Sequence, residues 1–374
     1  MVEWKKLGNL CEIKTGKGIT QKDCTVDGVY PVISGGQCPM GMYSQYNREA
    51  DTITISRVGA YAGFVSFIKN RFYLNDKCFS IIPFKESLII NKFLFDVLKN
   101  QEEGIKKLQS EGGVPTINTK KLSALDIPIP PLSEQNRIVG ILDTFTESIE
   151  NIKKQITERK KQYEHYRDQL LDLEGKPGVE MMSMGELFTF KNGLNKGKEF
   201  FGSGKPIIMF SNVFNSRYLK SSMITNRVDI TEKEMERIDA KIGDVFFTRT
   251  SETREDVGYS SVLLEDIGEC TFAGFLIRAR PLTDKLIPSY CKYCFSSPII
   301  RCSIIGNSSF TTRASLTGSG LGKIDLPIPP LSQQSRIVSI LDTFEASIAN
   351  LEQQLTHRQK QYEYYRNMLL TFDE

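Results

Sequence analysis

Residues 126–171 read DIPIPPLSEQNRIVGILDTFTESIENIKKQITERKKQYEHYRDQLL, and residues 325–370 read DLPIPPLSQQSRIVSILDTFEASIANLEQQLTHRQKQYEYYRNMLL. The second stretch repeats the first at a constant offset of 199 residues, without a gap and with 30 of 46 positions identical. The segments before the two copies, 1–125 and 179–324, differ in length and sequence. A repeated frame that carries two divergent segments indicates one scaffold presenting two binding surfaces, which favours recognition over catalysis.

Each copy is expected to form one long helix. Paired prolines precede Ser133 and Ser332, which are suitable N-cap residues because a serine hydroxyl accepts a hydrogen bond from an unpaired backbone N–H group. Gly175 and Pro177 follow the first copy, an order that is typical after a helix. Apolar residues recur in steps of four and three, and a 3.5-residue period over about five heptads indicates a coiled coil. About forty residues would make a rod of roughly 60 Å.

The predicted coiled-coil seam contains one arginine in each copy. Because a buried charge is costly unless it is paired or reaches water, we expect Arg159 and Arg358 each to meet a carboxylate or a carbonyl group near the middle of the rod. Two tyrosines and a leucine continue each series. The seam residues are Ile138, Leu142, Phe145, Ile149, Ile152, Ile156 and Arg159 in the first copy, and Ile337, Leu341, Phe344, Ile348, Leu351, Leu355 and Arg358 in the second.

The two seams match, so pairing of the helices with each other is the economical arrangement. They could instead be core elements of a larger fold, but forty residues far exceed the average helix of about 11 residues. We favour antiparallel pairing. The predicted fold is therefore α+β: two mixed α/β domains, residues 1–125 and 179–324, joined by two long helices within 126–178 and 325–374 that form an antiparallel coiled coil with a pseudo-twofold internal repeat.

The composition is that of a multidomain soluble protein, with 374 residues, 40% hydrophobic and 25% charged. No apolar run predicts a membrane span and the first residues do not resemble a signal peptide, so we expect a cytoplasmic protein without membrane contact. The eight cysteines have no disulfide-framework spacing, which favours reduced thiols. Cys291 and Cys294 form a lone CxxC pair in a chain with two histidines, so no metal site is expected.

The net charge of +3 is unevenly distributed. Residues 1–125 carry 17 basic and 12 acidic side chains, and residues 179–324 carry 19 and 16. The helical segments are acidic, with a net charge of −2 in 126–178 and −3 in 325–374. The divergent domains therefore hold the basic character with which a polyanion would be bound.

Both divergent domains are expected to mix strands and helices. A glycine- and lysine-containing loop near the start of each one suggests that a whole unit of domain plus helix was duplicated. The predicted strands are Thr52–Ser56, Phe64–Ile68 and Cys78–Phe84 in the first domain and Val245–Arg249, Ser260–Glu265 and Phe272–Arg280 in the second, followed by helices at Asn91–Leu108 and 288–305 respectively.

Signatures of catalysis and of cofactor binding are scarce. The chain has no GxxxxGK[ST] phosphate loop, no HExxH and no GxSxG, and no glycine motif follows a strand in the way that methyl-donor binding requires. The Pro-Pro pairs lack the flanking residues of a loop that holds a flipped base. We therefore expect no enzymatic activity and no cofactor in this chain.

The order of these features resembles the specificity subunit of Type I restriction-modification systems. The resemblance covers the whole chain and is carried by PIPPLSEQ-x-RIV-x-ILD at 128–143 and its repeat at 327–342. It implies that each divergent domain is a target recognition domain for one half of a split double-stranded DNA sequence. It also implies that the paired helices set the spacing and hold methyltransferase subunits, two in number, through which restriction subunits join. S-adenosylmethionine and ATP then belong to those partners.

Candidate DNA contacts follow from residue chemistry. Lysines beside glycines can neutralise phosphate, and arginines in loops at strand ends can donate two hydrogen bonds to guanine. For any one of these residues a solvated surface charge is the competing interpretation, and the matched location in both domains favours the functional one. The candidates are Lys14, Lys17, Arg57 and Tyr61 in the first domain and Lys191, Lys196, Lys198, Arg249, Arg254 and Tyr259 in the second.

Two other classes of function stay open on the residues alone. A structural adaptor that tethers two partner proteins through the rod would show no salt-dependent DNA binding. A chain with hidden nuclease or methyltransferase activity would turn over its substrate without partners.

Overall fold

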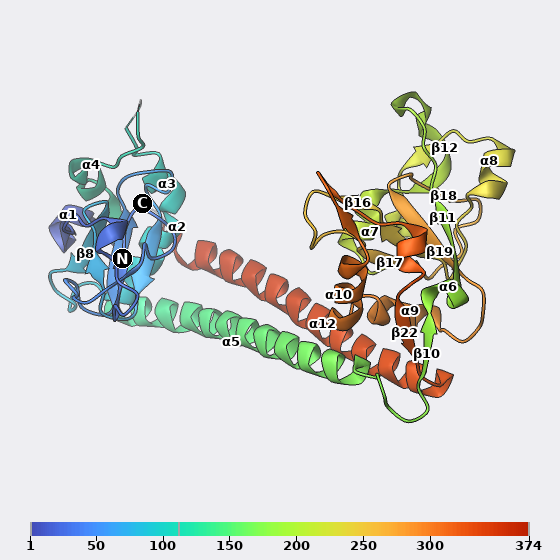
Figure 1. Ribbon diagram of the computed structural model, residues 1–374. Coiled ribbons are helices and arrows are strands. Elements are labelled where there is room, and N and C mark those ends of the chain that lie inside the picture. Colours follow the sequence, from blue (N-terminus) through green and yellow to red (C-terminus); the bar gives the residue numbers. More distant parts are fainter. Residues whose placement is uncertain (1, 111–112, 373–374) are drawn as a thin grey trace. The chain divides into compact units, whose positions relative to one another are not determined.

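The protein is represented by a computed structural model that describes residues 2–110 and 113–372 (Figure 1). The chain divides into two compact units. One unit contains the residues up to Lys154 together with those from Glu352 onward, and the other contains Gln155–Leu351. Both long helices pass from one unit into the other, so each unit holds one divergent domain and a stretch of each helix.

The first divergent domain contains a four-stranded sheet, a smaller three-stranded sheet and short helices. A strand pair, β1 with β9, links the start of the domain to the residues just before the long helix. Its elements are β1 (Glu3–Lys6), α1 (Leu7–Leu10), β2 (Cys11–Thr15), β3 (Tyr30–Ile33), β4 (Met42–Tyr43), β5 (Thr52–Ser56), β6 (Val65–Ile68), β7 (Tyr73–Leu74), β8 (Cys78–Pro83), α2 (Asn91–Asn100), α3 (Glu102–Lys106), α4 (Thr119–Ser123) and β9 (Asp126–Ile129).

The second divergent domain has the same plan with additions. Its elements are β10 (Glu180–Ser183), α6 (Met184–Leu187), β11 (Phe188–Asn192), β12 (Phe201–Ile208), α7 (Phe210–Asn215), β13 (Tyr218–Leu219), β14 (Arg227–Val228), α8 (Glu232–Arg237), β15 (Val245–Thr248), β16 (Thr250–Ser251), β17 (Ser260–Leu263), β18 (Thr271–Phe272), β19 (Leu276–Pro281), α9 (Pro288–Cys294), α10 (Pro298–Gly306), β20 (Ser309–Phe310), β21 (Ala314–Ser315), α11 (Gly318–Leu321) and β22 (Asp325–Ile328).

The two domains share one sheet topology although their sequences differ. The main sheet has the order β2-β8-β5-β6 in the first and β11-β19-β15-β17-β13 in the second, so the second adds one edge strand. The smaller sheets, β4-β3-β7 and β14-β12-β18, each contain one parallel pair. The pair β10 with β22 corresponds to β1 with β9. This agreement supports duplication of a whole domain-plus-helix unit.

Five of the six predicted strands are present, four of them with a different end. The sixth, predicted at Phe272–Arg280, is divided into β18 and β19, and both predicted domain helices are also interrupted. The helix predicted at 91–108 is divided into α2 and α3. The one predicted at 288–305 stops at Cys294, and α10 starts at Pro298. The Ser297 hydroxyl caps this new helix by accepting a hydrogen bond from the Ile300 N–H at 3.4 Å. Proline favours the first turn of a helix, which accounts for the restart.

The two repeated segments form the long helices α5 (Leu132–Leu171) and α12 (Leu331–Leu369), as the repeat predicts. The predicted N-caps are wrong, because Ser133 and Ser332 lie inside the first turn. Gln135 N–H already donates to the Pro131 carbonyl at 3.0 Å, and Gln334 makes the same bond to Pro330. The fixed φ of proline is preorganised for a helix start, so each helix begins directly after its proline pair.

The helices pair in antiparallel directions. In the first unit the ring of Phe145 stacks on Tyr365 with centroids 5.1 Å apart. In the second unit Tyr166 stacks on Phe344 at 5.4 Å. Positions 145 and 344 correspond in the repeat, as do 166 and 365, so the second contact is the first with the two copies exchanged. This exchange confirms the antiparallel coiled coil and the pseudo-twofold repeat.

The seam residues divide between two environments. Near each helix start, Ile138 and Leu142 are buried in the hydrophobic core of the first domain, and Ile337 and Leu341 in that of the second. Further along, the remaining seam residues are buried or partly buried, and several of them meet the opposing helix. The rod is therefore anchored at both helix starts in globular cores.

The seam arginines lie against aromatic rings of the opposing helix. The Arg159 guanidinium carbon is 5.9 Å from the centre of the Phe344 ring, and that of Arg358 is 5.6 Å from Phe145. Arg358 also donates to the side-chain amide oxygen of Gln361 at 3.0 Å. Arg358 therefore has the expected carbonyl partner, in the side-chain amide of Gln361. For Arg159 the structure shows the face of the Phe344 ring, which attracts a cation through its quadrupole.

A buried glutamine joins each domain to its helix. Gln135 is 0% exposed; its Oε1 accepts from the Ile90 N–H at 2.9 Å, and its Nε2 donates to the carbonyls of Pro130 and Leu88 at 2.9 and 3.1 Å. Unpaired buried backbone groups are costly, so this side chain fixes the start of α2 against α5. Gln334 makes the corresponding three bonds with Ile287, Pro329 and Lys285.

Candidate nucleic-acid interface

Arg57 and Arg249 occupy equivalent positions at the end of a central strand. Arg57 follows β5; its N–H donates to the Lys77 carbonyl at 2.8 Å and its carbonyl accepts from the Ile117 N–H at 2.9 Å. Arg249 follows β15 and makes the same two backbone bonds, to Phe275 and from Leu316, both at 2.8 Å. The correspondence that the sequence suggested is therefore a shared backbone arrangement in both domains.

A buried asparagine organises the turn beside Arg57. The Asn75 side chain donates to the Ile19 carbonyl at 2.8 Å and accepts from the Lys77 N–H at 3.1 Å. The Lys17 N–H donates to the Leu74 carbonyl at 3.0 Å. These bonds bring Lys17, Lys77 and Arg57 to one end of the domain. The half-buried Arg57 side chain also donates to the Asp76 carbonyl at 3.3 Å, which orients its guanidinium group.

The glycines beside the candidate lysines serve close packing of backbone. A Cβ atom on Gly16 would lie 1.9 Å from the Leu74 carbonyl oxygen, and one on Gly193 would lie 2.2 Å from the Ala273 oxygen. No side chain fits at those separations. Both glycines therefore hold the loop after β2 or β11 against the small sheet, which gives Lys17 its position.

In the second domain Arg301 clamps the loop that carries Arg254 and Tyr259. Its guanidinium group donates to the carbonyls of Gly258 at 2.6 Å and of Val257 at 2.9 Å. It also lies 4.6 Å from the centre of the Tyr259 ring. Burial lowers the pKa of Arg301 from its usual value. The partly desolvated guanidinium group of Arg301 is occupied by its hydrogen bonds to the loop. Arg301 therefore positions the exposed residues and does not present charge to a ligand.

Exposed arginine and aromatic side chains gather around that loop. Arg254 lies 5.8 Å from the centre of the exposed Phe310 ring, which belongs to a strand of the β16-β21-β20 sheet. Phe275 is exposed at the turn that binds the Arg249 backbone. Arginine with aromatic faces can contact both phosphate and bases, so this surface suits a nucleic acid.

The candidate lysines differ in their availability. Lys17, Lys191 and Lys198 are exposed, and Lys14 is exposed but lies 2.6 Å from Glu12 on its own strand. Lys196 is only 14% exposed at its side chain and lies 2.8 Å from Glu234. Its hydrogen bond to Glu234 is the main reason that the pKa of that carboxyl falls to about 2. The structure thus commits Lys196 to the domain, whereas the other four lysines stay accessible.

Three residues that form or support this interface were not predicted: Lys77, Asn75 and Arg301. Lys77 follows no glycine and no recognisable strand end, Asn75 acts through long-range bonds, and Arg301 lies in α10 far along the chain. A sequence pattern could have indicated only Lys77, as a basic residue in the turn before β8. The pairing of β2, β5 and β8 is what brings these positions together.

The structure also bears on metal binding and nucleophilic chemistry. Among residues 2–110 and 113–372, no group of three or more His, Cys, Asp or Glu side chains is placed to hold a metal ion. Burial raises the pKa of the Cys294 thiol to about 12, so that thiol stays protonated at neutral pH.

Within residues 2–110 and 113–372, no helix is both long and apolar enough to cross a membrane.

Comparison with known proteins gives one consistent family. The family model of the Type I restriction modification DNA specificity domain matches residues 1–159 and 177–358. A putative type I specificity subunit of Mycoplasma pneumoniae is 24% identical over 99% of this chain and 97% of its own length. The specificity subunit of the EcoR124I and EcoR124II enzymes of Escherichia coli is 30% identical over 66% of this chain and 61% of its own.

A solved structure shows the same fold. The crystal structure of a Type I restriction-modification S subunit from M. genitalium aligns with a TM-score of 0.64, at 17% identity, over 100% of this chain and 97% of that one. At 17% identity, this similarity is evidence for the fold alone.

Proposed function

Since this chain belongs to the Type I restriction-modification DNA specificity family, we propose that it directs methyltransferase and restriction subunits to a bipartite DNA target with a non-specific spacer. Each divergent domain recognises one half of that target, and the spacer corresponds to the rod. The chain performs no chemistry of its own. S-adenosylmethionine and ATP act in the partner subunits.

The equivalence of Arg57 and Arg249 is the observation that carries the proposal. The same backbone arrangement presents an arginine from two domains whose surrounding surfaces differ, as two readers of different half-sites require. Bidentate bonds from arginine to guanine are the commonest specific contact in the major groove. Arg254, Tyr61 and Tyr259 flank these positions, and Lys14, Lys17, Lys191 and Lys198 supply contacts to phosphate, which are independent of sequence.

The repeated helices supply two docking surfaces for methyltransferase subunits. Leu132 is 39% exposed and the corresponding Leu331 is 49% exposed, and Arg137 and Arg336, each five residues further along, are also exposed. Burial in a hydrophobic core explains why the two copies have the same residues at buried positions of the repeat. It does not explain why they have the same residues at these exposed positions. Exposed residues that both copies retain favour one kind of partner bound twice.

The test is co-expression of the chain with its cognate methyltransferase subunits, followed by genome-wide mapping of methylated bases. The proposal expects methylation at one interrupted sequence, and expects that the purified chain binds its DNA with a salt-dependent affinity. Methylation without sequence preference, or equal methylation in cells that lack the chain, would contradict it. The adaptor hypothesis expects no DNA binding, and methylation by the chain alone would support a hidden enzyme.

A further inference from the structure

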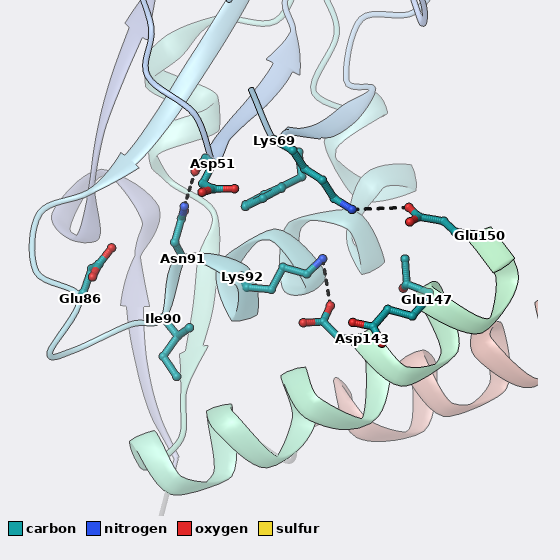
Figure 2. A pocket seen from close by; sticks show the side chains of 11 residues that line it. Asp51, Lys69, Glu86, Ile90, Asn91, Lys92, Asp143, Glu147 and Glu150 are labelled. Carbon is teal, nitrogen blue, oxygen red and sulfur yellow. Dashed lines mark hydrogen bonds and ion pairs between the residues drawn. The ribbon is translucent and has the colours of Figure 1, made fainter. Parts of the chain in front are cut away.

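A pocket of about 600 Å³ lies in the first unit where α5 meets the domain (Figure 2). The domain contributes residues beside β5 and β6 and from the first turn of α2, and α5 contributes the face from Asp143 to Glu150. Five carboxylates line this pocket: Asp51, Glu86, Asp143, Glu147 and Glu150.

The pocket has an excess of negative charge that the protein does not neutralise. Its two lysines are already paired, Lys69 with Glu150 at 3.6 Å and Lys92 with Asp143 at 3.2 Å. Figure 2 shows both pairs on one side of the pocket. The carboxylates of Asp51, Glu86 and Glu147 have no ion-pair or hydrogen-bond partner within the described part of the chain.

An unused hydrogen-bond acceptor lies beside these carboxylates. The Asn91 side chain donates to the Asp51 carbonyl at 2.6 Å, and its Oδ1 atom is buried with no partner among the described residues. A buried acceptor without a donor costs about 1–3 kcal/mol. Because this oxygen is shielded from solvent, the groups open to an occupant are the unpaired carboxylates. A guanidinium group carries five N–H donors in a planar fork and a permanent charge, which suits carboxylates.

The second copy of the helix lacks this acidic face. Glu147 and Glu150 correspond to Ala346 and Ala349, although 30 of 46 positions of the repeat are identical. Its additional carboxylate, Glu345, forms an ion pair with Lys292 at 3.0 Å and another with Arg217 of its own domain. The copies therefore differ at two positions that line the pocket in the first unit, so the acidic pocket is a feature of the first copy.

The charge of the pocket selects its occupant. Three unpaired carboxylates repel a DNA phosphate backbone, whereas they attract a basic side chain of a protein. One wall is the helix on which partner subunits dock in the proposed function, and the inference rests on that function. We propose that the pocket receives an arginine side chain of the methyltransferase subunit docked on the first copy, so that two subunits on similar surfaces are held with unequal affinity.

The test compares the full-length chain with a variant that carries Glu147→Ala and Glu150→Ala, the residues of the second copy. Titration with the cognate methyltransferase subunit is followed by native mass spectrometry and calorimetry. The unaltered chain should show two dissociation constants about tenfold apart, a difference of about 1.4 kcal/mol. The variant should lose the tighter constant and bind both subunits alike. The tighter constant should also weaken more steeply with salt.

A matched control removes the same charge elsewhere: Glu164→Ala with Glu174→Ala, two exposed positions of the second unit that do not line the pocket. This control should leave both constants unchanged. Equal constants in the unaltered chain, or an equal loss in the control, would overturn the pocket assignment. Tighter DNA binding by the variant with unchanged subunit binding would also overturn it. Failure of the unaltered chain to bind any subunit would instead overturn the proposed function itself.

Discussion

Replacing Asp96 by asparagine should stabilise the first unit above pH 7 and leave its stability unchanged below about pH 4. Asp96 lies on α2, is 1% exposed, and its Oδ2 atom has no hydrogen-bond partner among the described residues. Burial raises its pKa to about 7; Lys92 and Arg366 oppose this rise and Asp143 adds to it. In the folded chain this carboxyl group therefore keeps its proton until the pH approaches about 7.

The magnitude follows from the two pKa values. An aspartate in an unfolded chain releases its proton near pH 4, and each unit of pKa difference corresponds to about 1.4 kcal/mol. Between pH 4 and 7 the folded carboxyl retains a proton that the unfolded chain has lost, so stability falls as pH rises through this window and is constant above it. A shift of about three units sets an upper limit of about 4 kcal/mol. Asparagine has no proton to lose, so the variant escapes this penalty.

The single tryptophan, Trp4, lies in β1 and reports on the first unit. Urea unfolding followed by its fluorescence should give a free-energy difference between the variant and the unaltered chain that grows from pH 4 to pH 7. The exposed Asp27→Asn change is the control and should show no such growth. A difference that is the same at pH 4.5 and pH 8, or a variant that is less stable at pH 8, would refute the reasoning.

Three further expectations concern the candidate nucleic-acid interface and the connection that Gln135 makes between the first domain and α5. Arg57→Ala and Arg249→Ala should each weaken discrimination in one half-site by about 1–3 kcal/mol, measured by competition between matched and mismatched duplexes; equal losses on random DNA would show that these residues contact phosphate. Lys17→Ala should weaken binding to all sequences and reduce the dependence on salt, and an unchanged salt slope in titrations would contradict this. Gln135→Leu leaves three buried backbone groups unpaired, at about 1–3 kcal/mol each; unaltered urea unfolding by Trp4 fluorescence would show that water replaces them.

The sequence was sufficient for the rod and for three strands in each of the two main sheets. The heptad series from Ile138 to Ile156 predicted α5 because its period is local and extends over many turns. Strands such as Thr52–Ser56 were visible because their apolar residues are contiguous and end at turns. The sequence favoured the antiparallel direction without requiring it, and the contacts of Phe145 with Tyr365 and of Tyr166 with Phe344 together establish it.

Long-range contacts account for what the sequence did not reveal. Gln135 looks like a polar surface residue of a helix, and only the folded chain shows that its amide binds backbone at Leu88 and Ile90. Lys196 looked available for phosphate because its ion pair with Glu234 joins residues 38 apart. Glycine beside lysine suggested a contact with DNA phosphate, whereas at Gly16 the requirement for glycine comes from the neighbouring strand.

The central claim, that each domain recognises one half of the target, is tested most directly by replacing residues 179–324 with a second copy of 1–125. The hybrid keeps both helices, and Gln334 can bind the transplanted partners of Gln135, so the fold and subunit docking should survive. Methylated sites are then mapped in cells that express the hybrid with the methyltransferase. The antiparallel repeat predicts an interrupted palindrome made of the first half-site and its reverse complement. Methylation of a direct repeat of that half-site, or of the original target, would contradict the account.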